Sequence, residues 1–253
     1  MRRVVSSRTG RDIALIGAAF ALCPLAAALA PADPSGPLSR ADAVASFEHG
    51  IGSFFEPAVA RWVSGQPALS ALLAFLYLWG HVPATVGSLV WARLERPRFF
   101  PLARNAFLAT QLLVIAGYLL ALTAPPRMRS GQIHAGGLVH TVQSPYAAMP
   151  SGHVAFAVVA AVIVGSQVPA LRYVAPLYPL VVTGVVIATA NHFWLDAVAG
   201  ASAGATGFAV AVIARTAFRR WSNRRPAVAR RRRDHVGSDA SPPRSEAHAS
   251  AGA

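Results

Sequence analysis

The sequence contains little of what stabilises small secreted domains or keeps soluble domains in solution. Its single cysteine, Cys23, excludes an intrachain disulfide framework and a metal site built from several cysteines. Charged residues make up only 13% of the chain, whereas soluble domains average about a quarter. Acidic residues are the scarcest, with 10 Asp and Glu against 23 Lys and Arg. This composition argues against an ordinary soluble globular domain.

In place of charge, the chain has long apolar runs. Hydrophobic residues make up 54% of it, and the mean hydropathy is +0.45. A membrane-spanning helix needs about 20 mostly apolar residues, and six segments reach or approach that length. They are residues 13–30, 69–92, 106–123, 154–168, 173–190 and 197–217. We therefore predict an all-α integral membrane protein, built as a bundle of six transmembrane helices.

The net charge of +13 is unevenly distributed along the chain. Arginines gather before the first expected span, between the second and third, between the fourth and fifth, and after the sixth. They are Arg2, Arg3, Arg8, Arg11, Arg93, Arg96, Arg98, Arg104, Arg172, Arg219, Arg220, Arg224, Arg225 and residues 230–233. All these segments fall on one side of a six-span arrangement. The positive-inside rule makes that side cytoplasmic, together with both termini.

The charge pattern also bears on partners and domains. No arginine cluster alternates with stacking aromatic residues, so nucleic acid is not an expected partner, whereas membrane lipids are. We predict a cytoplasmic N-terminus over residues 1–12, the six-helix membrane domain over 13–218, and a basic, disordered cytoplasmic tail over 219–253. The tail lacks the periodicity of a packed segment.

The first apolar run has a second interpretation. Its preceding arginines and the string Ala28-Leu29-Ala30 also match a signal peptide with an A-x-A cleavage site. The near-spanning length of the run favours a retained helix. Both interpretations leave the orientation of the later spans unchanged.

The segment between the first two expected spans is not simply a polar loop. Within residues 39–65, apolar side chains recur at helical spacing: Phe47, Ile51, Phe54, Phe55, Val59 and Trp62. We predict an amphipathic helix in the outer membrane interface. It serves either as packing over the bundle, the simpler interpretation, or as a lid for a lipid substrate.

Two short strings carry the candidate chemistry. In Asn191-His192-Phe193-Trp194-Leu195-Asp196, the histidine and aspartate are four residues apart and share one face of a helix. A carboxylate there can orient the imidazole and leave its other nitrogen nucleophilic. The structural alternative is an interfacial histidine that caps helix ends.

The second string is Met149-Pro150-Ser151-Gly152-His153, at the start of the fourth apolar run. A proline favours the first position of a helix, and backbone N–H groups of a first helical turn bind anions. Ser151 can donate to a phosphoryl oxygen, Gly152 lets phosphate approach the backbone, and His153 can protonate a leaving oxygen. The alternative is an ordinary helix start with an incidental histidine.

Arg127 ends the third expected span on the outer side, against the positive-inside trend. A guanidinium can neutralise phosphoryl oxygens with two parallel hydrogen bonds, although a snorkelling interfacial arginine is the alternative. Another candidate arginine set, Arg93-x2-Arg96-Pro97-Arg98, lies in an expected cytoplasmic connection, across the membrane from both histidines.

These motifs resemble two signatures of the type 2 phosphatidic acid phosphatase superfamily, six-helix membrane enzymes related to the vanadium haloperoxidases. The resemblance covers roughly residues 106–217. It implies that His192 is a nucleophile that forms a phosphohistidine, that Asp196 orients it, and that His153 is the general acid. Ser151, the Gly152 N–H and Arg127 would stabilise the transferring phosphoryl group. No metal and no cofactor is expected.

The sequence departs from the family pattern at the other cationic positions. The family's first signature has a lysine seven residues before an Arg-Pro pair, where this chain has Leu120 and Met128. The third signature begins with Ser-Arg, replaced here by Val185 and Val186. The candidates to replace the missing cations are Arg129, His134, His140 and Asn191.

These departures resemble the inositolphosphotransferase branch, which is similar to fungal inositol phosphorylceramide synthases. We therefore predict a membrane lipid phosphatase or phosphotransferase with an extracytoplasmic site, acting on a lipid phosphate, a polyprenyl (di)phosphate or an inositol phospholipid. Hydrolysis and transfer to an alcohol stay open, as does the oligomeric state. The alternatives are a non-catalytic membrane protein that binds a lipid head group and a His-ligated metal or haem protein.

Overall fold

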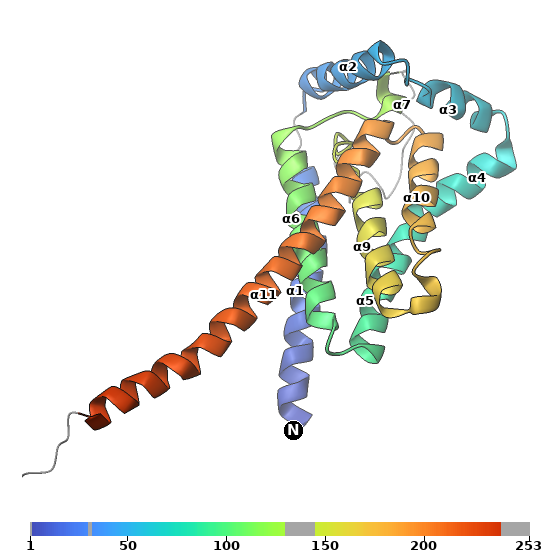
Figure 1. Ribbon diagram of the computed structural model, residues 1–253. Coiled ribbons are helices and arrows are strands. Elements are labelled where there is room, and N and C mark those ends of the chain that lie inside the picture. The colour runs from blue at the N-terminus through green and yellow to red at the C-terminus, as the bar shows by residue number, and fades with distance from the viewer. Residues whose placement is uncertain (1, 30–31, 130–144, 239–253) are drawn as a thin grey trace, which may run out of the picture. The chain divides into compact units, whose positions relative to one another are not determined.

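The computed structural model describes residues 2–29, 32–129 and 145–238, and the regular structure within these ranges is helical (Figure 1). An isolated parallel bridge joins Thr123 and Ala147. The chain forms two compact units, Met1–Val212 and Ile213–Ala253. The first unit contains the helical bundle and every motif discussed above.

The bundle is built around α9 (Gly152–Gln167), which packs against α5 (His81–Glu95), α6 (Phe100–Leu120) and α10 (Leu177–Ala188). Ten of the 16 residues of α9 are buried, as expected for a helix that is apolar on all sides. The N-terminal helix α1 (Arg2–Ala28) packs on α6. The ring of Phe107 lies 5.2 Å from both Phe20 of α1 and Phe156 of α9, between centroids.

The second expected span is interrupted by a π-helical turn. It consists of α4 (Pro67–Phe75), the π turn η1 (Leu76–Gly80) and α5. Together, Pro67–Glu95 form one continuous apolar helix. Single π turns inside α-helices are frequent at functional sites, and this one lies beside the N-terminus of α9.

The last helix of the bundle, α11 (Trp194–Ser238), approaches its neighbours through glycines. A Cβ atom at Gly200 would collide with the backbone of Ser151, just before α9, and one at Gly204 with the backbone of α9 itself. A Cβ atom at Gly207 would collide with Thr110 of α6. Small residues at helix interfaces permit such close packing in membranes. The N-terminal ends of α9 and α11 therefore lie close together, which brings their motifs together.

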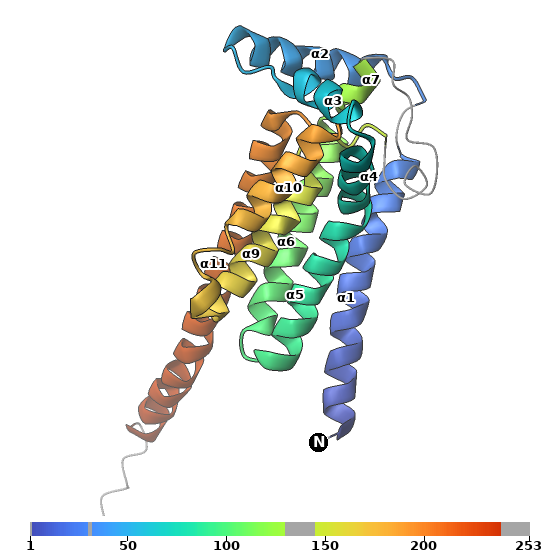
Figure 2. The same ribbon diagram turned by 90° about the vertical axis from the view of Figure 1, so that its right-hand side faces the viewer.

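Three short helices lie across one end of the bundle: α2 (Ser35–Gly50), α3 (Glu56–Ser64) and α7 (Pro126–Arg129) (Figures 1 and 2). The single amphipathic helix predicted over residues 39–65 is thus two helices. The break between them contains Gly52 with φ +71°, a conformation that glycine adopts readily. Pro57 in the first turn of α3 favours a new helix start there.

The prediction of six spans is supported only in part. Three helices in the described part of the chain are long and apolar enough to cross a membrane: Pro67–Glu95, Phe100–Leu120 and Trp194–Asn223. The fourth and fifth expected spans are shorter apolar helices, α9 and α10. α10 begins only after Pro176, because η2 (Pro169–Leu171) and a run of turns occupy the preceding residues.

The C-terminal unit differs from the expectation of a disordered tail from residue 219. The helix α11 continues to Ser238, since alanine and arginine both have high helix propensity. Residues 239–253 lie outside the described part of the chain. The three predicted domain boundaries remain predictions.

Candidate functional site

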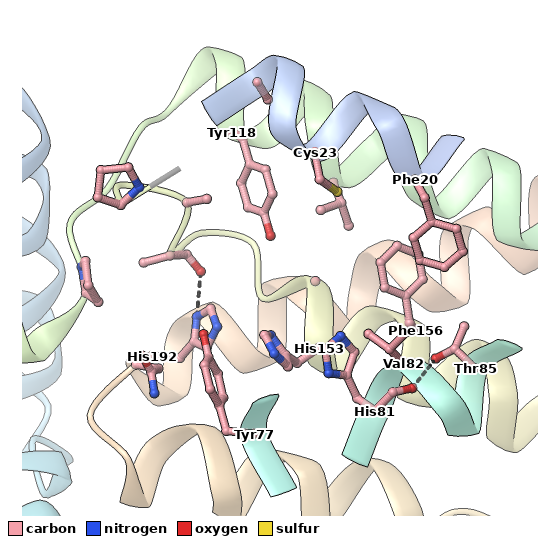
Figure 3. Close-up of a pocket in the computed structure, with 18 of the residues that line it drawn as sticks. Phe20, Cys23, Tyr77, His81, Val82, Thr85, Tyr118, His153, Phe156 and His192 are labelled. Atoms are coloured by element: carbon pink, nitrogen blue, oxygen red, sulfur yellow. Dashed lines mark hydrogen bonds between the residues drawn. The ribbon is translucent and has the colours of Figure 1, made fainter. Parts of the chain in front are cut away.

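A cavity of about 330 Å³ lies inside the first unit at the N-terminal end of α9 (Figure 3). Its wall combines α1, the π turn, α5, α6, α9 and the connection between α10 and α11. The lining residues are Phe20, Cys23, Ala26, Tyr77, His81, Val82, Thr85, Val114, Tyr118, Pro125, Arg127, Pro145, Ala147, Ala148, Gly152, His153, Phe156, Asn191 and His192. Four of the six predicted site residues are among them: His192, His153, Gly152 and Arg127.

His192 lies on the turn between α10 and α11. Its side chain is buried and forms part of the cavity wall. Its ring atom Nδ1 is 2.8 Å from the carbonyl oxygen of Ala148. A carbonyl oxygen only accepts hydrogen bonds, so this contact places a proton on Nδ1 and leaves the lone pair on Nε2. Ala190, two residues earlier, has φ +52°, which is unfavourable for alanine and marks a constrained turn.

Asp196 is fully buried and lies beside His192, but the two do not share a helix face as predicted, because α11 begins only at Trp194. Its Oδ2 atom is 3.5 Å from His192 Nδ1, farther than the Ala148 oxygen. The same Oδ2 accepts a 2.9 Å hydrogen bond from the backbone N–H of Phe193, one half of a capping box at the start of α11. Asp196 therefore caps the helix and adds negative charge next to the imidazole. It does not line the cavity.

Two buried glutamates, which sequence reasoning did not assign to the site, hold the same helix end. Glu56 Oε1 accepts from the Trp194 N–H at 2.8 Å, and Glu48 Oε1 accepts from the Leu195 N–H at 3.1 Å. Both glutamates are fully buried. Side-chain oxygens at a helix N-terminus stabilise it by accepting hydrogen bonds from its unpaired N–H groups. The helices α2 and α3 thus fix the start of α11, which carries the turn with His192.

The buried position of Glu48 also changes its acidity. Burial raises the pKa of the Glu48 carboxyl from 4.5 to about 8, and the neighbouring Glu56 adds to this rise, against the opposing effect of the hydrogen bond from Leu195. Glu48 therefore carries its proton through most of the neutral range. The sequence contained a signal for these glutamates, because acidic residues recur within the otherwise apolar helical pattern of residues 39–65.

Ser151 and Gly152 start α9 in different roles. Ser151 is the N-cap: its Oγ accepts from the Val154 N–H at 3.4 Å, and the side chain is fully buried and does not line the cavity. Pro150 thus precedes the N-cap rather than occupying the first helical position. Gly152 faces the cavity, and a Cβ atom there would lie 2.9 Å from the Tyr118 hydroxyl. A larger residue would therefore narrow the cavity.

His153 follows Gly152 in the first turn of α9 and lines the cavity. Its ring centroid is 5.9 Å from that of His192, in an edge-on arrangement. The ring also contacts Tyr77 and His81 of the second span, with centroids at 4.3 and 3.9 Å. Sequence reasoning missed both residues. The available signal was His81 itself, because an ionisable residue inside a membrane span suggests a function.

Arg127, in the short helix α7, contributes the positive charge of the cavity. Its Nη1 donates a hydrogen bond to Asn191 Oδ1, and its backbone N–H donates to the Ala190 carbonyl oxygen at 3.1 Å. Burial lowers the pKa of the Arg127 guanidinium, which stays cationic because its ordinary value is so high. Asn191, one of the candidates for replacing the missing cations, thus orients Arg127 beside His192.

Arg129, another candidate replacement, does not line the cavity. Arg129 pairs with Asp42 at 2.7 Å and lies over the ring of Phe54. His134 and His140 are outside the described residues. Leu120, in place of the family's lysine, is 82% exposed, and no lysine occurs anywhere in the chain.

Neither Arg93 nor a metal-binding group of side chains adds to the cavity within the described residues. Arg93, in the second arginine-rich segment, contacts Thr9 and Asp12 of α1 and does not line the cavity. Within the described residues, no three His, Cys, Asp or Glu side chains are grouped so that they could hold a metal ion. The expectation of a reaction without metal or cofactor remains a prediction.

Comparison with known proteins identifies a family for this chain. No curated protein and no solved structure gives a match to the chain. The family model of the PAP2 superfamily matches residues 42–210, a range that contains all six predicted site residues. The match covers well over half of the sequence and includes part of α2 and the whole of α3 and α9. The chain therefore belongs to the PAP2 superfamily.

Proposed function

We propose that this protein is a membrane lipid phosphatase or phosphotransferase that works through a phosphohistidine on His192. Membership in the PAP2 superfamily points to phosphatase-type chemistry. The observation that carries the specific proposal is the 2.8 Å contact between His192 Nδ1 and the Ala148 carbonyl oxygen. It leaves Nε2 as the nucleophilic nitrogen on a histidine that lines the cavity with Arg127 and His153.

The proposed reaction has two steps. In the first, the lone pair on His192 Nε2 forms a bond to phosphorus while the bond to the leaving oxygen breaks, and that oxygen takes a proton from His153. In the second, the oxygen of water or of an alcohol attacks phosphorus, and its proton returns to His153. The phosphorus–nitrogen electron pair then returns to His192. Arg127 and the N-terminal turn of α9 stabilise the phosphoryl charge during both steps.

The surroundings of the histidines support a lipid substrate. Beyond His153 the cavity wall is largely apolar and includes Phe20, Val82 and Phe156. Apolar side chains favour contact with hydrocarbon and exclude water, while Arg127 favours a negatively charged group. This combination suits a phosphate attached to an alkyl or prenyl chain, and the arginine distribution supports an extracytoplasmic site.

The acceptor in the second step decides between hydrolysis and transfer. The resemblance to the inositolphosphotransferase branch favours an alcohol acceptor, and Asn191 beside Arg127 distinguishes this site from the more cationic pattern of the wider superfamily. We include the inositol phospholipids among the candidate donors for that reason. Phosphatidic acid and polyprenyl diphosphates are the candidates for simple hydrolysis.

Phosphorus-31 NMR of the products tests the proposal. Detergent-purified protein is incubated with phosphatidic acid, a polyprenyl diphosphate and phosphatidylinositol, with a lipid alcohol as acceptor. Free phosphate indicates a phosphatase, and a new phosphodiester signal indicates a transferase. Neither should form with His192→Ala, whereas His49→Ala, which changes an exposed histidine outside the cavity, should behave like the wild type.

The alternative is a non-catalytic protein that binds a lipid head group. In that case His192→Ala and the wild type would leave every substrate unchanged but would bind phosphatidic acid vesicles equally well. Product formation that persists in His192→Ala would instead show that the protein is an enzyme but would contradict the role of His192.

A further inference from the structure

Two aromatic side chains from another helix contact the ring of His153. Tyr77 stacks on it with a centroid distance of 4.3 Å and an interplanar angle of 18°. His81 lies closer, at 3.9 Å, with its ring tilted by 48°. Figure 3 shows His153 between the two. His153 is also buried, so the two rings and the surrounding side chains constrain its orientation.

Both rings come from the interrupted second span. Tyr77 belongs to the π turn Leu76–Gly80, and His81 is the first residue after it. Both line the cavity. The π turn thus lies where this helix supplies two aromatic side chains to the same neighbour, and π turns of this kind are frequent at functional sites.

We propose that Tyr77 and His81 are positioning residues that orient His153 and stabilise its imidazolium form. This inference rests on the proposed function, in which His153 gives a proton to the leaving oxygen. Burial disfavours a charged imidazole, so His153 needs a nearby group that favours the cation. The faces of aromatic rings attract cations within about 6 Å, and both centroid distances are well below that limit. His81 acts here as a neutral ring.

The proposal predicts a dependence on the leaving group. An alkoxide is a poor leaving group and requires protonation, whereas p-nitrophenolate departs without it. Loss of the imidazolium form of His153 should therefore slow the reaction of decyl phosphate much more than that of p-nitrophenyl phosphate. A loss of folding or of the nucleophile would slow both substrates equally.

The test compares ring-retaining with ring-removing variants by kcat/KM on these two substrates. Tyr77→Leu and His81→Leu should each lower the ratio of alkyl to aryl reactivity by about 2- to 30-fold, the range of cation–π stabilisation. Tyr77→Phe and His81→Phe should lower it much less. His153→Ala sets the upper limit of the effect, about 100- to 10,000-fold for a general acid. Tyr178→Leu, which removes a ring from α10 outside the cavity, should leave the ratio unchanged.

Two results would overturn this inference. One is an unchanged ratio in both leucine variants, and the other is an equal loss in the leucine and phenylalanine variants. His192→Ala provides the separate check on the reaction itself. If it cleaved both substrates at the wild-type rate, the proposed function would fail, whatever the ratios in the other variants.

Discussion

The Nδ1 atom of His192 lies closer to the carbonyl oxygen of Ala148, at 2.8 Å, than to Oδ2 of Asp196, at 3.5 Å. The backbone before α9 therefore fixes the tautomer of a histidine that precedes α11. The role of Asp196 is correspondingly divided, because the same carboxylate oxygen caps α11 through the Phe193 N–H. The position of the proposed nucleophile, His192, thus depends on how the N-terminal ends of two helices pack together.

The two roles of Asp196, as a cap of α11 and as a negative charge beside His192, predict the effect of Asp196→Asn. The amide oxygen can still accept from the Phe193 N–H, so the cap and the melting temperature should change little. The negative charge next to His192 is lost, and we expect kcat to fall roughly 10- to 100-fold, the range for a charged hydrogen-bonding group. Asp196→Ala should lose both the activity and the cap. Equal melting temperatures for the two variants would contradict the capping role.

The pKa of Glu48 predicts how stability changes with pH. A carboxyl whose pKa is raised from 4.5 to about 8 binds more protons in the folded than in the unfolded protein between these values. The free energy of unfolding should therefore fall as the pH rises from about 5 to 8. Glu48→Gln cannot ionise and should flatten this dependence, as measured by thermal unfolding in detergent. Glu95→Gln, at an exposed position, is the control. Identical slopes for Glu48→Gln and the wild type would contradict this account.

Arg127 and Asn191 should act as one unit. Arg127→Met removes the positive charge of the cavity, and we expect kcat/KM to fall by about 10- to 100-fold or more, as for the loss of a charged hydrogen bond. Asn191→Ala leaves the charge but not its orientation and should have a smaller effect. In the double variant the two losses should not add, because both act on one interaction. Additive losses would show that Asn191 does not act through Arg127.

The first helix should remain in the mature protein. Asp12 pairs with Arg104, Gln111 donates to the Ala19 carbonyl oxygen at 2.9 Å, and Phe20 and Cys23 form part of the cavity wall. Removal of α1 would expose this wall. The intact mass of the purified protein should therefore include residues 1–30. A mature N-terminus near residue 31 would contradict this prediction and support the signal-peptide interpretation.

The sequence was informative where a motif is local. Pro150-Ser151-Gly152-His153 and His192-x3-Asp196 each span the start of a helix, and the structure brings His153, His192, Gly152 and Arg127 to one cavity. Apolar runs likewise indicated the helices but not their exact lengths. Prolines and turns shorten α10, and a glycine divides the interfacial segment into α2 and α3.

The sequence was less informative where a role depends on packing between distant elements. Ser151 has the right chemistry for phosphate, but its hydroxyl is used inside α9. Glu48 and Glu56 lie in the predicted amphipathic segment, but their hydrogen bonds to the start of α11 depend on how α2 and α3 pack over it. Tyr77 and His81 are four residues apart and share one face of their helix, but only the packing of that helix on α9 places this face against His153. No local spacing rule predicts these contacts.

The central claim is that His192 carries the phosphoryl group during the reaction. Mass spectrometry of protein quenched at alkaline pH during turnover of the active substrate tests it most directly. The account predicts a phosphoryl group on the peptide that contains His192, absent from His192→Ala and lost on incubation in acid. Turnover with no phosphorylated histidine, or with the phosphoryl group on a different residue, would contradict it.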